Sequence, residues 1–124
     1  MRLILPVCLL LLVGCASVEQ TQPLEYGCSD LVVVGRLRTL SSTSTNDPSD
    51  ILGHSMWDSE IDIDRVIRGK ERRRTVRASG FSHAQVRDDV DLVIVLATTA
   101  DGGRYSVRTL NVWPTSLASR CTSE

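Results

Sequence analysis

Apolar and polar residues alternate along much of the chain in a pattern that predicts β-strands. Residues 56–67 carry Trp57 and Ile61 on one face and acidic side chains on the other, and this period of two is typical of a half-buried strand. Residues 30–40 are rich in β-branched side chains and are apolar on both faces in their first half. Gly35 stands where that second pattern changes, so we expect a bulge or a sharp bend there.

Three further segments complete a set of five predicted strands. Residues 73–78 form the weakest of them, because Val76 is their one strongly apolar residue. Residues 90–98 are the most apolar stretch of the domain and predict a central strand that is buried on both faces. A hairpin turn at 101–103 leads to the last predicted strand, 104–112.

The remaining segments predict connections and one short helix. Residues 41–53 are rich in Ser, Thr, Asn and Asp and predict a loop. Residues 114–120 predict a short helix that ends at Cys121. Because the chain shows five strands, no long helix and no internal repeat, the expected fold class is all-β, a small closed or nearly closed barrel.

The N-terminus has the features of a secretory signal. Residues 3–13 form an apolar run after the basic Arg2. As a helix the run spans about 16 Å, which is too short for a bilayer core of about 30 Å, whereas its length suits a signal peptide. Residues 12–15 (LVGC) resemble the lipobox of bacterial lipoproteins, which implies cleavage after Gly14 and acylation of Cys15, palmitate included. An ordinary cleaved signal with a chance cysteine is the alternative.

The lipobox resemblance divides the chain into three parts: a lipoprotein signal peptide (1–14), a lipidated tether (15–26) and a barrel domain (27–124). The tether is polar, contains Pro23 and shows no period. Because no Asp follows Cys15, the resemblance implies the outer membrane of a Gram-negative cell, facing the periplasm. The first expected partner is therefore the membrane, through the N-terminal lipid.

Charge is balanced overall but concentrated locally. A net charge of −1 with 42% hydrophobic residues excludes a disordered chain and a globally basic nucleic-acid binder. Residues 65–77 nevertheless carry seven basic residues and one acidic residue. Anionic lipid headgroups or an acidic envelope protein are the partners that such a run can attract. The candidate anion-binding residues are Arg68, Lys70, Arg72, Arg73, Arg74 and Arg77.

Two other interpretations of the basic run bear on function. Nucleic acid is not an expected partner, because the run lacks the aromatic residues on which bases stack. The run also follows the acidic residues of 58–64 across a turn, so the two sets of charges can pair across neighbouring strands in a purely structural role. We favour solvated or paired charge over a dedicated site.

The cysteines and histidines favour a structural role. Cys28 and Cys121 lie near the two ends of the domain, and in an oxidising periplasm they predict a disulfide rather than a redox pair. His54 and His83 lie in predicted loops without the three or four ligands that zinc requires, so we expect solvent-exposed histidines, no metal site and no cofactor. The chain also lacks a Gly-x-Ser-x-Gly elbow and a Gly-rich phosphate loop, which favours a protein that is not an enzyme.

Several segments, in order, resemble the inhibitory domain of the tissue inhibitors of metalloproteinases, an OB-fold shared with netrin modules. They are 28–33 (CSDLVV), 60–69 (EIDIDRVIRG), 113–117 (WPTSL) and the closing Cys121. The resemblance implies a five-stranded OB-fold-like barrel. The family inhibits through an N-terminal Cys-x-Cys whose amine and carbonyl chelate the protease zinc, and this chain has no such pair.

From these patterns we expect a non-enzymatic outer-membrane lipoprotein whose barrel is a periplasmic binding or structural module. The alternative is a proteinase inhibitor of the family's type that acts through a loop edge instead of a chelating terminus.

Overall fold

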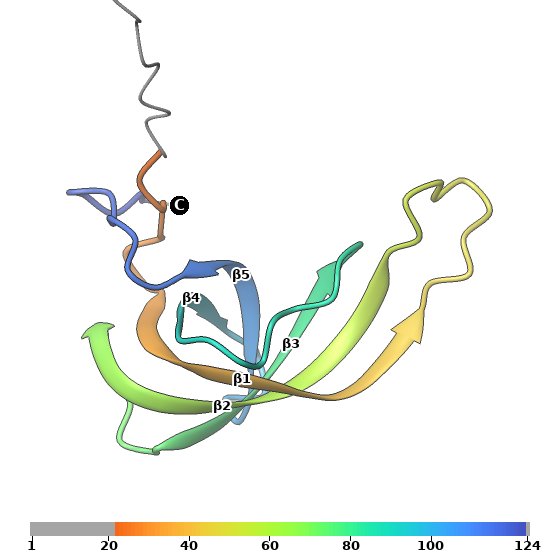
Figure 1. Cartoon of the computed structure of the whole chain (residues 1–124). Coiled ribbons are helices and arrows are strands. Elements are labelled where there is room, and N and C mark those ends of the chain that lie inside the picture. The colour runs from red at the N-terminus through yellow and green to blue at the C-terminus, as the bar shows by residue number, and fades with distance from the viewer. Residues whose placement is uncertain (1–21, 124) are drawn as a thin grey trace, which may run out of the picture.

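The computed structural model describes residues 22–123 and shows five β-strands that close into a barrel (Figure 1). β1 (Leu31–Ser44) and β2 (Ser55–Arg68) are the longest. They are followed by β3 (Thr75–Ser82), β4 (Leu92–Thr98) and β5 (Tyr105–Val112). The sequence-based prediction of an all-β, five-stranded barrel is confirmed.

The strands close the barrel in the order β1-β2-β3-β5-β4. All neighbouring pairs are antiparallel except β3 and β5, which run parallel and pair only at Ala78–Tyr105 and Ser79–Ser106. β1 is shared between two neighbours: it pairs with β4 only from Leu31 to Gly35, whereas its ladder with β2 continues to Ser44. The final part of β1 therefore has β2 beside it and no second strand among the described residues.

Gly35 is the last residue of β1 that pairs with β4, whereas pairing with β2 continues beyond it. The ladder with β2 shifts register between Val34 and Gly35, as the sequence predicted for a bulge. A Cβ atom at Gly35 would lie 2.2 Å from the backbone oxygen of Asp62, so only glycine allows the two backbones to approach this closely.

Replacing Gly35 by alanine is therefore expected to destabilise the barrel by about 1–3 kcal/mol, the usual cost of forcing extra atoms into a packed site. Urea denaturation followed by far-ultraviolet circular dichroism measures the change. Gly103→Ala is the matched control, because its added Cβ has no neighbour closer than 4.0 Å. Equal stability of the two variants would contradict the proposed backbone contact.

Two hydrophobic clusters explain why some strands are apolar on both faces. The barrel interior holds Val33, Leu37, Ile61 and Ile94 among its buried residues. A second cluster lies outside the barrel, where Val32, Val93 and Val95 pack with Tyr26 under the segments that precede β1 and follow β5; its further members are Leu24, Ile67, Trp113, Leu117 and Ala118. β1 and β4 thus contribute one face to each cluster.

The predicted helix at 114–120 is wrong. Residues 113–123 contain no helix and run beside the N-terminal segment, with bridges that join Leu24 to Leu117 and Gly27 to Thr122. Backbone partners from a distant part of the chain replace the local hydrogen bonds of a helix, and Leu117 gains a place in the second cluster.

The end of the segment predicted as a tether also belongs to this structure. Leu24 pairs with Leu117, and Tyr26 is buried, so the folded unit reaches N-terminally of residue 27. The predicted signal peptide and Cys15 lie outside the described residues. Within residues 22–123 there is no helix of the length and hydrophobicity needed to cross a membrane.

Candidate functional site at the mouth of the barrel

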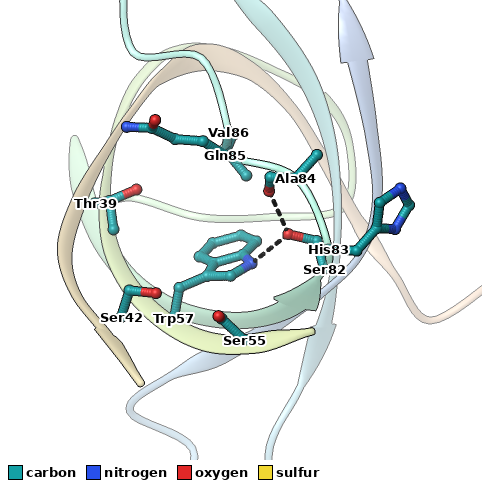
Figure 2. Close-up of a pocket in the computed structure, with 9 residues that line it drawn as sticks. All are labelled: Thr39, Ser42, Ser55, Trp57, Ser82, His83, Ala84, Gln85 and Val86. Carbon is teal, nitrogen blue, oxygen red and sulfur yellow. Dashed lines mark hydrogen bonds between the residues drawn. The ribbon is translucent and has the colours of Figure 1, made fainter. Parts of the chain in front are cut away.

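One end of the barrel carries a hollow of about 300 Å³, which we call the mouth. β1 and β2 form one side of it, and the end of β3 with the residues that follow forms the other (Figure 2). The lining residues are Thr39, Ser42, Ser55, Trp57, Ser82, His83, Ala84, Gln85 and Val86. A concave site of this volume is at the lower end of the range of small-ligand pockets.

Trp57 forms the floor of the mouth. The alternation of β2 turns its ring toward the barrel interior, where it is 7% exposed. The ring packs on Gly80, at which a Cβ atom would lie 2.1 Å from a ring carbon. Trp57 Nε1 donates a hydrogen bond to Ser82 Oγ at 3.2 Å, and Ser82 Oγ donates to the backbone oxygen of Ala84 at 2.7 Å. Two contacts with β3 therefore hold the ring in one orientation, and Figure 2 shows the hydrogen bonds that link Trp57, Ser82 and Ala84.

The mouth is neutral and rich in hydroxyl groups. Thr39, Ser42 and Ser55 surround the Trp57 ring, and no lining residue is Asp, Glu, Lys or Arg. The Ser82 hydroxyl bonds to an indole and a backbone carbonyl and has neither a histidine nor a carboxylate as partner. Such a hydroxyl lacks the adjacent base that activates a nucleophile. The lining suits recognition of an uncharged ligand.

The structure brings the two histidines together, which the sequence did not predict. The β2–β3 ladder pairs Met56 with Phe81, and His54 stacks on Phe81 with ring centroids 4.7 Å apart. The His83 ring meets His54 edge-on at 5.4 Å. The expectation that both would be isolated in exposed loops is wrong for His54, which is partly buried, because strand pairing links positions far apart in sequence.

Asp50 completes this histidine cluster. Its Oδ1 lies 2.7 Å from His54 Nδ1, and this hydrogen bond lowers the pKa of the Asp50 carboxyl. Within residues 22–123 no group of three His, Cys, Asp or Glu side chains is arranged to hold a metal ion. His83 is among the residues that line the mouth, but in Figure 2 its ring points away from Trp57.

The predicted anion-binding residues surround the β2–β3 connection, at the opposite end of β2 from Ser55 and Trp57. All six are exposed: Arg68, Lys70, Arg72, Arg73, Arg74 and Arg77. Arg73 is not a free cation, because it forms an ion pair with Glu71 at 2.9 Å. The Arg73 hydrogen bond, aided by that of the Tyr105 hydroxyl, lowers the pKa of Glu71 to about 2.

The acidic face of β2 finds partners, but mostly outside the basic run. Glu60 pairs with Arg38 of β1, and Asp58 lies 3.8 Å from Arg104 in the β4–β5 connection. Asp62 accepts a hydrogen bond from the Thr75 hydroxyl at 3.1 Å. The sequence correctly placed these side chains on one face of β2. It did not identify their partners, because these come from β1, from β3 and from the β4–β5 connection.

The mouth itself was missed by the sequence analysis. The one available signal was Trp57, a large aromatic residue on the inward face of a strand in a chain with only 4% aromatic residues. Nothing in the local pattern indicated that residues 82–86 would return to face β1 across that ring. Comparisons with protein-family models, with curated proteins and with solved structures find no match to this chain.

Proposed function

We propose that this chain is a lipid-anchored, non-enzymatic binding module of the bacterial cell envelope. Its recognition site is the mouth, and its barrel is of the OB-fold type. The observation that carries the proposal is the neutral hollow over Trp57. Gly80 and Ser82 fix the orientation of the Trp57 ring, to which we assign no catalytic role. A rigid aromatic floor with hydroxyl groups around it provides shape and hydrogen bonds for a bound group.

The strand arrangement supports the OB-fold part of the proposal. An OB-fold is a five-stranded Greek-key barrel that binds ligands on the face of its second and third strands and on the adjoining loops. Here the order β1-β2-β3-β5-β4 closes a barrel of five strands, and β2 and β3 supply Trp57 and Ser82 to the mouth. The resemblance to the tissue inhibitors of metalloproteinases points to the same fold.

The lipobox-like residues 12–15 support the anchoring part. Replacing Cys15 by alanine is expected to leave an unlipidated precursor, because the thiol that receives the diacylglyceryl group is lost. Incorporation of labelled palmitate, followed by cell fractionation, measures this outcome. Cys8→Ala is the matched control and is expected to incorporate label normally. Normal labelling and membrane localisation of the Cys15 variant would exclude lipidation at this residue.

Photocrosslinking in intact cells tests the binding function. Gln85 is exposed and lines the mouth, so a benzoyl-phenylalanine placed there is expected to capture a specific envelope component. The same group at Ser119, an exposed position on the segment after β5, is the control. Mass spectrometry identifies the product. Equal capture at both positions, or none at the mouth, would refute recognition at this site.

A second function, proteinase inhibition through a loop edge, is favoured by one observation. The connection between β1 and β2 projects beyond the barrel (Figure 1) and exposes two apolar side chains, Ile51 at 93% and Leu52 at 62%. Exposed apolar residues on a projecting loop are candidates for insertion into another protein. If the protein has this second function, its recognition surface is the β1–β2 connection and not the mouth.

The two functions predict different inhibition assays. We expect no tight, zinc-directed inhibition of a metalloproteinase, since an acylated Cys15 has no free amine to bind zinc. Inhibition at submicromolar concentration that depends on residues 15–28 would refute this expectation. Inhibition that is lost in the double variant Ile51→Ser, Leu52→Ser, with the barrel still folded, would support the loop-edge function instead.

A further inference from the structure

The mouth lies beside an unpaired strand edge. This edge indicates which kind of partner the mouth binds, so the inference rests on the proposed function. β4 leaves β1 after Gly35, and beyond that point β2 is the one strand next to β1 in the described part of the chain (Figure 1). Arg36 is held by Asp91, with Nε and Oδ1 3.0 Å apart, so the connection into β4 covers the edge there. Residues 39–44, which we call the free edge, extend beyond this cover.

The direction of the backbone groups along the free edge follows from the ladder. Thr45 donates its backbone N–H to the backbone oxygen of His54, and the register is regular from Ser41 to Ser44. In an antiparallel ladder the backbone groups of successive residues point to alternate sides. Ser41 and Thr43 therefore direct theirs toward β2, whereas Ser42 and Ser44 direct theirs outward.

The free edge has little protection against another strand. Exposed edges are normally guarded by charged residues or proline, or by a bulge. Residues 39–44 (TLSSTS) contain no charge and no proline, and a register shift at Leu40 is their one irregularity. The outward-directed backbone groups of Ser42 and Ser44 lie after this register shift in the sequence. Residues 41–44 therefore remain a regular stretch of edge.

The free edge and the mouth share Ser42. Its backbone groups point outward along the edge, and the residue also lines the hollow above Trp57. A strand added beside Ser42 would place alternate side chains on the inner side of the sheet, toward the hollow. Main-chain hydrogen bonds and a side-chain pocket are the two elements of peptide recognition by strand addition.

We propose that the free edge binds an extended, uncharged segment of a partner protein as an added strand, with one bulky apolar side chain seated in the mouth against Trp57. The neutral lining selects against a charged side chain at that position, because burying an unpaired charge is costly. A second copy of this chain fits less well: paired edge to edge, it would offer its own Thr39 and Ser42, which are too small to fill a hollow of about 300 Å³.

A library of short random peptides displayed on phage is the probe, and the purified full chain in mild detergent is the target. Selected peptides are expected to be uncharged, with one bulky apolar residue. Binding of such a synthetic peptide is expected to slow hydrogen exchange at the amides of Ser42 and Ser44 more than at those of Ser41 and Thr43. If no peptide is enriched, or if exchange at Ser42 and Ser44 is unchanged on binding, the proposal is wrong.

Two substitutions at Ser42 separate the backbone from the side chain. Ser42→Pro removes the outward N–H at an edge position where proline is tolerated. It is expected to weaken peptide binding roughly tenfold, because one hydrogen bond is lost and the peptide carbonyl is left unpaired. Ser42→Ala keeps the N–H and is expected to bind the peptide more tightly than Ser42→Pro does. Equal binding by the two variants would overturn strand addition.

Substitutions at Ala84 test the pocket separately. Ala84→Phe is expected to fill the mouth and to abolish the preference for a bulky apolar residue, whereas Ala84→Ser leaves the hollow open. A chain that is dimeric in sedimentation, and that Ser42→Pro converts to monomers, would show that a second copy occupies the edge and would overturn the proposal. If the proposal fails while crosslinking from Gln85 persists in cells, the mouth binds another kind of ligand and the proposed function stands.

Discussion

Loss of the Cys28–Cys121 disulfide is expected to lower the free energy of unfolding by about 4–5 kcal/mol, the value of the chain-entropy model for a loop of this length. The structure joins these cysteines across 93 residues, as the sequence predicted, and so ties the segment that precedes β1 to the segment that follows β5. Urea denaturation measures the loss. Because each removes the same bond, Cys28→Ser, Cys121→Ser and the double variant are expected to lose similar amounts.

Peptide mapping without reduction is the direct control for the disulfide. It is expected to recover a cross-linked pair of peptides that contain Cys28 and Cys121. Recovery of both cysteines in alkylated form from the native protein would contradict the bond. If the stability loss of the double variant equalled the sum of the two single losses, the two cysteines would act independently. That result would contradict a single bond shared by both.

Replacing Asp30 by alanine is expected to destabilise the barrel by about 2–4 kcal/mol, because the buried N–H of Gly27 loses its acceptor and the charged hydrogen bond with the half-exposed Arg108 is lost. The Asp30 side chain is 1% exposed and lies 2.9 Å from Arg108 of β5. Its other oxygen accepts the backbone N–H of Gly27 at 2.6 Å, so one carboxylate holds the entry to β1 against β5.

Two further variants divide the contribution of Asp30. Asp30→Asn keeps an acceptor for the Gly27 N–H but loses the charge, so it is expected to lose less stability than Asp30→Ala. Arg108→Ala leaves the buried carboxylate without its ion-pair partner. A double-mutant cycle on Asp30 and Arg108, measured by urea denaturation, gives their coupling energy. A loss below about 1 kcal/mol in Asp30→Ala, the range of exposed pairs, would contradict the buried interaction.

The sequence by itself determined the strands of this protein, their number and the fold class. Alternation in β2 and the double-sided apolar runs of β1 and β4 are local properties, and β2, β4 and β5 lie close to their predicted ranges. β1 and β3 each continue four residues beyond the predicted end, so the start of the predicted loop 41–53 is part of β1. The bulge at Gly35 was also predictable, because a glycine inside a strand removes a side chain that must otherwise pack. The disulfide followed from the positions of two cysteines.

Only the tertiary structure decided which distant residues meet. The β2–β3 ladder brought His54 to Phe81, and the return of residues 82–86 toward β1 built the mouth over Trp57. Residues 114–120, predicted as a helix, instead run beside the N-terminal segment, where Leu117 forms an isolated bridge with Leu24. The physical reason is the same in each case. The local pattern of apolar and polar residues indicates which face of a segment is buried. Its hydrogen-bond and packing partners depend on how the strands pair when the barrel closes.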